Sequence, residues 1–154
     1  MNRKTLYWLP LFILPICNVL IALILKQSIA PVLPYILGAV VEELFFRLFL
    51  LRTIFLPRIK PALAILLVSV LFAGMHLFNL RAGAGATETL VQMIFAFCFS
   101  IWAGAVTWKS TWLIPLAAHV LLNLTATADV MWVSLVAGLL VLSDGIILMR
   151  STDS

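Results

Sequence analysis

Three ionisable residues lie inside an apolar stretch that is long enough to cross a membrane. Glu42, Glu43 and Arg47 belong to residues 29–51, which read IAPVLPYILGAVVEELFFRLFLL. On insertion scales, each ionisable group at that depth costs about 2.5 to 3.5 kcal/mol. A membrane span keeps three of them only when they pair with one another, are buried against partners, or take part in chemistry. This stretch therefore constrains both the fold and the function of the chain.

The composition excludes an ordinary soluble protein. Of the 154 residues, 64% are hydrophobic and 10% are charged, whereas soluble domains contain about 25% charged residues. The net charge of +4 is typical of membrane proteins with basic cytoplasmic loops, and no stretch resembles a nucleic-acid groove. We therefore expect a lipid bilayer as the surroundings and no nucleic acid as a partner.

The apolar runs predict an all-α, polytopic membrane helix bundle with about six transmembrane helices in a single domain, residues 1–154. Each run is roughly 17–23 residues long, which suits a hydrocarbon core of about 30 Å. The first run resembles a signal peptide, but Pro31 follows the apparent cleavage site, so we expect an uncleaved anchor. The six expected spans are residues 6–25, 29–51, 61–80, 88–108, 111–127 and 130–149.

The basic residues predict an orientation for these spans. With a cytoplasmic N-terminus, seven basic residues lie inside and two lie outside, and the side with more basic residues is usually cytoplasmic. The chain is therefore predicted to have both termini in the cytoplasm. The inside group is Arg3, Lys4, Arg52, Arg58, Lys60, Lys109 and Arg150, and the outside group is Lys26 and Arg81.

The charged residues of the second span have a helical spacing. Glu43 and Arg47 are four residues apart, so they share a helix face and can form an ion pair. Glu42 points about 100° away, because a helix turns once every 3.6 residues. A structural ion pair needs only one carboxylate, so the second glutamate is free to face a cavity. The alternative is a structural pair beside a protonated carboxyl group.

Two further spans carry polar groups that could meet these glutamates. His76 lies four residues after Phe72, and His119 lies four residues before Asn123. Taken singly, each is typical of a packing residue or of a polar contact between helices. Taken together, they give three spans one polar face each. We therefore predict that the three faces meet inside the bundle.

Such a cluster can hydrolyse a carbonyl compound. A carboxylate and an imidazole that share a water can deprotonate it, and a second imidazole with a carboxamide can donate hydrogen bonds to the resulting oxyanion. No nucleophile is apparent: Cys17 and Cys98 are expected to be buried thiols, and Ser69 and Ser100 are expected to bond to their own helices. A Glu, His, His set can also bind zinc, but no HExxH motif is present, so metal binding is the second interpretation.

The ordered set of motifs is specific. Glu42-Glu43-x-x-x-Arg47, Phe72-x-x-x-His76 and His119-x-x-x-Asn123 resemble the three signature motifs of the CAAX protease and bacteriocin-processing family of intramembrane endopeptidases, also called the Abi family. The resemblance covers a motif core of residues 40–124. It implies a glutamate-dependent peptidase in which Glu42 and His76 activate water, His119 and Asn123 stabilise the oxyanion, and Glu43 and Arg47 support the site.

The leading hypothesis is an intramembrane endopeptidase that cleaves a membrane-associated or exported protein or peptide. No cofactor and no metal are expected. The range of the family, together with the basic residues, favours a bacterial inner membrane. Two alternatives remain open: a non-catalytic membrane immunity or partner protein, and a small proton or ion carrier, because buried acids and histidines also form proton relays.

Overall fold

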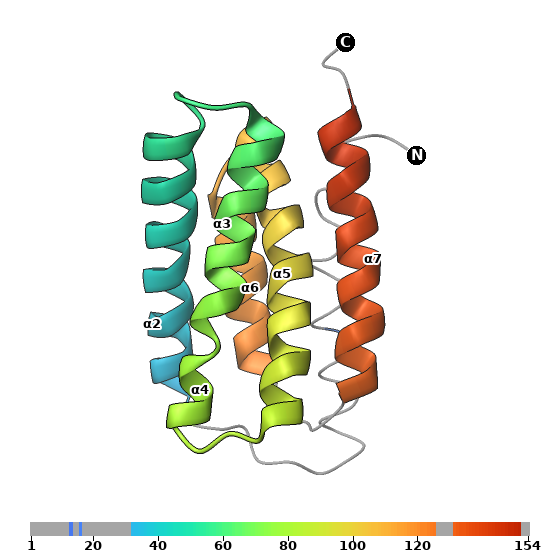
Figure 1. Ribbon diagram of the computed structural model, residues 1–154. Coiled ribbons are helices and arrows are strands. Elements are labelled where there is room, and N and C mark those ends of the chain that lie inside the picture. The colour runs from blue at the N-terminus through green and yellow to red at the C-terminus, as the bar shows by residue number, and fades with distance from the viewer. Residues whose placement is uncertain (1–12, 14–15, 17–31, 126–130, 152–154) are drawn as a thin grey trace.

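The computed structural model describes residues 13, 16, 32–125 and 131–151, and throughout these residues the chain is helical or forms short connections, with no strand (Figure 1). This confirms the predicted all-α class. The first expected span and the first residues of the second lie outside the described residues. The elements are α2 (Val32–Glu43), the π-helix η1 (Leu44–Phe55), α3 (Pro61–Met75), α4 (Phe78–Arg81), α5 (Ala86–Lys109), α6 (Leu113–Thr125) and α7 (Met131–Arg150).

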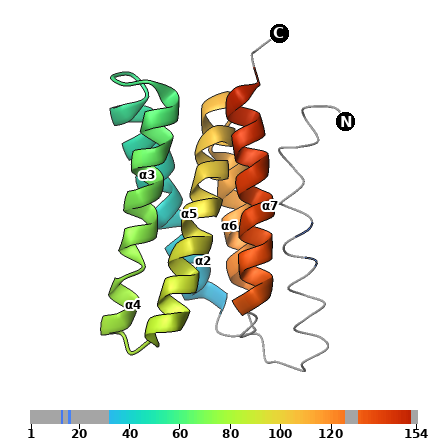
Figure 2. The ribbon, with the colours of Figure 1, turned by 45° about the vertical axis from the view of Figure 1, so that its right-hand side comes forward.

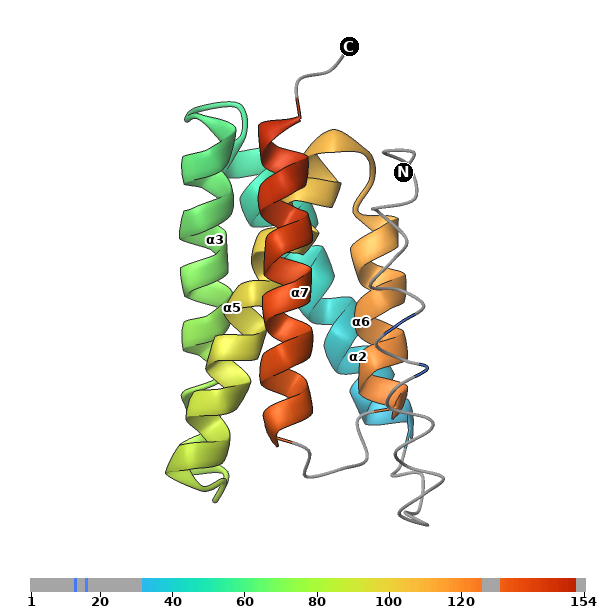
Figure 3. The ribbon, with the colours of Figure 1, turned by 90° about the vertical axis from the view of Figure 1, so that its right-hand side faces the viewer.

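Successive spans run in opposite directions because the connections between them are short. Residues 56–60 join η1 to α3, and residues 82–85 join α4 to α5. The second connection includes Gly83, whose φ of 95° is a conformation that glycine adopts without strain. The arrangement is an up-and-down bundle, with α7 lying along α5 (Figure 3).

Helix α5 is the centre of the bundle and contacts α3, α6, α7 and η1 (Figure 2). Every residue from 98 to 107 is buried, which is expected of a helix that is surrounded on all sides. Small residues allow the closest approaches. A Cβ atom at Gly104 would lie 2.8 Å from the Ile65 side chain on α3, and one at Gly145 on α7 would lie 2.8 Å from the Trp102 Cα atom. Such contacts are typical of membrane helix packing.

The outer surface of the bundle is apolar. Large exposed side chains include Val41, Val70 and Leu139, whereas the most buried side chains include Glu43 and Arg47. Two helical stretches, Pro61–Arg81 and Ala86–Lys109, are long and apolar enough to cross a membrane, and Leu113–Asn123 is a shorter apolar helix. An apolar exterior around buried charges is the arrangement of a membrane bundle rather than of a soluble protein.

Two predicted spans differ from the observed helices. The second was expected to end at residue 51, but it continues to Phe55 as a π-helix, in which the Leu56 amide bonds to the Leu51 carbonyl at 2.9 Å. The third was expected to run unbroken to residue 80, but α3 ends at Met75 and α4 begins at Phe78. Both irregularities lie beside predicted site residues, and π segments are frequent at functional sites.

Candidate active site

The centre of the site is a fully buried ion pair between neighbouring turns of one helix. Glu43 is the last residue of α2, and Arg47 lies in the first turn of η1. The Arg47 Nε atom is 3.0 Å from Glu43 Oε2, and neither side chain is exposed. The pairing predicted from the four-residue spacing is therefore confirmed.

Arg47 also joins η1 to two other helices. Its Nη1 atom donates a hydrogen bond of 2.9 Å to Ser100 Oγ on α5, and its guanidinium carbon lies 4.9 Å from the centre of the Phe72 ring on α3. The prediction that Ser100 bonds to its own helix is wrong, because this hydroxyl accepts from a charged donor on another helix. Ser69 does bond to its own helix, at the Ile65 carbonyl.

His119, in the middle of α6, lies between the two glutamates. Its Nδ1 atom is 3.0 Å from Glu43 Oε1, and its Nε2 atom is 3.7 Å from Glu42 Oε2. The two glutamates differ in exposure: the Glu42 side chain is 28% exposed and the Glu43 side chain is fully buried. Glu43 is thus occupied by Arg47 and His119, whereas Glu42 keeps a face open.

His76 is the C-cap residue of α3, directly at the break before α4. Its Nδ1 atom is 3.0 Å from the Phe72 carbonyl oxygen. A carbonyl only accepts hydrogen bonds, so Nδ1 is the donor in this contact, and Nε2 is the atom that can carry a lone pair. The Phe72 ring lies 5.3 Å from the His76 ring and 5.9 Å from the His119 ring, measured between centroids. Phe72 therefore packs against both imidazoles.

Asn123 lies four residues after His119 on α6 and is partly buried. The spacing places it on the same helix face as His119, one turn further along. Glu42 and His76 form neither a hydrogen bond nor an ion pair with each other. The structure thus joins Glu42, Glu43, Arg47 and His119 by polar contacts, and it connects His76 to them through Phe72.

The ring of His119 is enclosed on a second side by a residue that the sequence motifs do not include. Phe99 on α5 lies 5.3 Å from His119 between ring centroids. A single phenylalanine in an apolar helix carries no signal of a site, so sequence reasoning could not find it. Ser100 was visible as a hydroxyl group, but nothing in its own helix indicated that Arg47 would reach it.

The described ranges contain no group of three or more His, Cys, Asp or Glu side chains arranged to hold a metal ion. One candidate donor, the Glu43 carboxylate, is already engaged by Arg47 and His119. What the arrangement offers chemically is a partly exposed carboxylate, two oriented imidazoles and a buried cation that are held together within an apolar bundle.

Comparison with known families assigns the chain to one of them. The sequence profile of the Rce1-like type II CAAX prenyl endopeptidases matches residues 19–125. The chain belongs to this family. The matched region contains all six predicted site residues and ends at the last residue of α6, so α7 lies outside it. Membership identifies the chain as an integral membrane protein of a protease family. No curated protein and no solved structure matches the chain.

Proposed function

We propose that this protein is an intramembrane endopeptidase in which Glu42 is the general base. The observation that carries the proposal is the division of labour between the two adjacent glutamates. Glu43 is neutralised by Arg47 and His119, whereas Glu42 is partly exposed and lies 3.7 Å from His119 Nε2. A site built only for structural pairing needs no second carboxylate.

The reaction begins with a water molecule between Glu42 and His76. Glu42 takes one proton from this water, and the water donates a hydrogen bond through its other hydrogen to the His76 Nε2 lone pair. The water oxygen then attacks the carbonyl carbon of the peptide bond. A tetrahedral intermediate forms, and its oxygen carries the negative charge that Glu42 has lost. When the carbon–nitrogen bond breaks, Glu42 returns its proton to the leaving amine, so atoms and charge balance.

The oxyanion is assigned to His119 and Asn123. His119 donates Nδ1–H to the Glu43 carboxylate, so it can donate from Nε2 only as an imidazolium. During attack the negative charge moves from Glu42 to the oxyanion, and both positions lie on the Nε2 side of the ring. A protonated His119 would therefore face a negative charge before and after the attack, and preorganised donors of this kind are usually the largest catalytic term.

The substrate class proposed is a protein or peptide that is associated with the membrane or exported across it. The site lies among spanning helices with apolar outer faces, so a substrate in the same bilayer reaches it without leaving the membrane. Prenylated CAAX proteins, which the family's description names, are one instance of this class.

The test compares protein termini in membranes that contain the wild type or Glu42→Gln. Mass spectrometry of these termini should reveal cleavage products that are present with the wild type and absent with the variant. For the purified protein and the substrate found in this way, we expect a loss of about 10²–10⁴-fold in rate. Glu88→Gln is the matched control, because it makes the same chemical change at an exposed residue at the start of α5.

Two outcomes would reject the proposal. Full cleavage of a genuine substrate by Glu42→Gln would show that Glu42 is not the base. An identical set of termini in wild-type and variant membranes, with the biological effect of the protein retained by the variant, would favour a non-catalytic partner protein. Proton flux into proteoliposomes that is lost in Glu42→Gln would instead favour a carrier.

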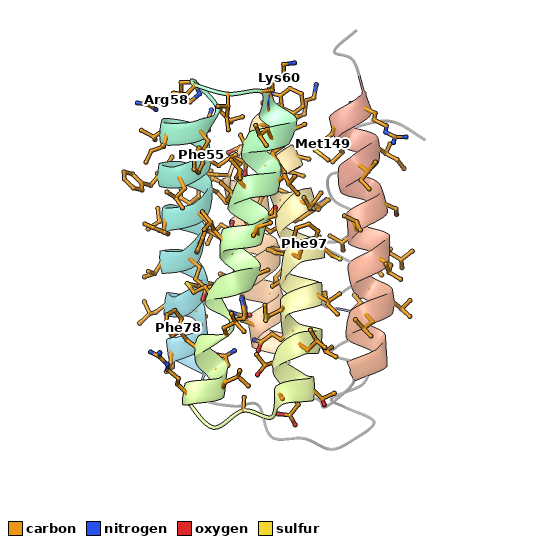
Figure 4. The ribbon with its side chains drawn as sticks, viewed as in Figure 1. Phe55, Arg58, Lys60, Phe78, Phe97 and Met149 are labelled. Carbon is orange, nitrogen blue, oxygen red and sulfur yellow. The ribbon has the colours of Figure 1, made fainter. Side chains whose placement is uncertain are left out.

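We also infer that the end of the bundle containing Arg58 and Lys60 faces the cytoplasm. Both lie at the η1–α3 connection, at the opposite end of the bundle from Phe78 on α4 (Figure 4). Lys109 joins the C-terminus of α7 at the same end, donating 3.1 Å to the Ser151 carbonyl oxygen. At the other end, the basic residue of the described chain is Arg81. This asymmetry supports an N-in orientation in an inner membrane.

Cysteine labelling tests the orientation after Cys17 and Cys98 are replaced. Ala82→Cys is preferred to a cysteine at Gly83, because the positive φ at Gly83 would strain any side chain. We expect an impermeant reagent supplied outside the cell to label Ala82→Cys and not Lys60→Cys. The reverse pattern would invert the orientation.

A further inference from the structure

A second buried acid lies outside both the site and the family-matched region. Asp144 on α7 is 5% exposed, and both of its carboxyl oxygens are buried without a standard hydrogen-bond partner in the part of the chain that the structure describes. An unsatisfied carboxyl group within a membrane bundle is costly. Such a residue needs an explanation, and the proposed reaction does not use it.

Asp144 lies beside a close approach of α7 to α5. The next residue, Gly145, is so close that a Cβ atom there would lie 2.8 Å from Trp102 Cα and 2.9 Å from Trp102 N. The Asp144 carboxyl group interacts with the Trp102 side chain. The Trp102 Nε1 atom is also buried without a standard partner. Among the described residues, an unsatisfied acceptor and an unsatisfied donor are thus neighbours, with no standard hydrogen bond between them.

Trp102 connects this contact to the site through a series of tilted ring contacts. The centroid of its ring lies 5.6 Å from that of Phe99, which precedes it by about one turn on α5, and the Phe99 ring lies 5.3 Å from His119. On α5, Trp102 therefore lies between the face that packs on α7 and the face that packs on α6. His119 has Phe99 on one side and Phe72 on another, while Glu43 holds Nδ1. The orientation of His119 Nε2 depends on these three contacts.

We propose that Asp144 is a positioning residue for His119, acting through Trp102 and Phe99. The carboxyl group attracts the indole N–H and restrains the rotation of Trp102. The Trp102 ring then keeps Phe99 against the imidazole, so that Nε2 stays directed toward Glu42 and the reacting carbonyl. That this alignment of His119 matters for cleavage rests on the function proposed above. That Asp144 aligns His119 does not depend on that function.

The first readout is spectroscopic and needs no substrate. The chain contains two histidines, so histidine-labelled protein in detergent micelles gives two imidazole signals, which His76→Gln assigns. We expect Asp144→Leu and Trp102→Phe to shift the His119 signal and to leave the His76 signal in place. Asp144→Asn keeps an acceptor oxygen for the indole and should remain close to the wild type. Ser143→Ala, at the exposed neighbouring position on α7, is the control.

The second readout is the kinetics of cleavage. Because misalignment of a catalytic group lowers the rate of the chemical step, Asp144→Leu should lower kcat by about 10- to 100-fold and leave KM within about twofold. Trp102→Phe should give a similar loss. The double variant should lose little more than either single variant, because both act on the same ring.

Two results would overturn the proposal. One is an unchanged His119 signal in Asp144→Leu. The other is a shift of both histidine signals together with a fall in melting temperature, which would indicate a general structural role. If Glu42→Gln retains cleavage, the proposed function fails, yet the His119 signal still decides whether Asp144 positions the imidazole. The two failures are therefore distinguishable.

Discussion

Glu43 and Asp144 are both buried carboxyl groups of membrane helices, but their surroundings differ completely. Glu43 is paired with Arg47 and His119 at 3.0 Å each, whereas Asp144 has no charged partner among the described residues and interacts with the neutral side chain of Trp102. Removing a partner of the first leaves an uncompensated buried charge. Removing the Asp144 carboxyl group eliminates a polar group that has no standard hydrogen bond to the described residues. A buried carboxyl group is thus expected to stabilise the fold at Glu43, where it has charged partners, and to destabilise it at Asp144, where it has none among the described residues.

The largest effect is expected for Arg47→Ala. This change leaves Glu43 without its guanidinium and also removes the contacts to Ser100 and Phe72, so the free energy of unfolding should fall by about 3–5 kcal/mol. For a chain of this size the melting temperature in detergent micelles should drop by roughly 10 °C or more. Arg47→Lys retains the charge without the planar fork and should lose less. An unchanged melting temperature for Arg47→Ala would show that the Glu43–Arg47 pair does not stabilise the fold, and the contrast with Asp144 would fail.

Ser100→Ala tests whether the Glu43–Arg47 pair is stabilised by the hydrogen bond from Arg47 to Ser100 on α5. The hydroxyl accepts a hydrogen bond from charged Arg47, and such bonds contribute about 1.5–3 kcal/mol. Ser69→Ala is the control, because Ser69 is equally buried but bonds only to its own helix. Thermal unfolding of the two variants in the same detergent should show a clear loss for Ser100→Ala and a small one for Ser69→Ala. Equal losses would mean that the Arg47 contact contributes nothing specific.

Gly145→Ala tests the packing of α7 on α5 next to Trp102. The added methyl group would lie 2.8 Å from the backbone of Trp102, which cannot rotate away, so α7 must shift and the expected cost is about 1–3 kcal/mol. Gly138→Ala on the same helix is the control, because its nearest neighbour, a Phe95 ring carbon, lies at 3.4 Å. A melting temperature lowered in Gly145→Ala and nearly unchanged in Gly138→Ala would establish the close contact of α7 with Trp102.

The contrast between the two acids also explains what the sequence could predict. Glu43 and Arg47 are separated by one helical turn, so their pairing follows from spacing alone. The polar faces around His76 and His119 were visible because polar residues are rare in apolar spans. Asp144 has no charged neighbour one turn away, and its partner Trp102 lies on another helix, 42 residues earlier. A contact of that kind depends on how helices pack, which spacing does not encode.

The same reasoning applies to the fold. Hydropathy and length predicted the helices α5, α6 and α7 to within two residues, because apolar runs and their polar ends are local features. The π-helix after Glu43 and the break of α3 at His76 were not predicted. Residues 44–55 carry no proline or glycine to mark the change, and the break follows an apolar run without an obvious stop signal. Both depend on contacts between helices.

The smallest effect on stability, and the most informative, is expected for Asp144→Leu. The carboxyl group is buried without a standard hydrogen bond to the described residues. Replacing it with an apolar side chain therefore removes a desolvation cost and should leave the free energy of unfolding within about 1 kcal/mol of the wild type, or raise it. Asp144→Asn retains a polar group and should not exceed the leucine variant in melting temperature. A large loss in Asp144→Leu would show that the carboxyl group is satisfied as fully as that of Glu43. Retained stability combined with a shifted His119 signal would instead identify Asp144 as a group kept for alignment at the expense of stability.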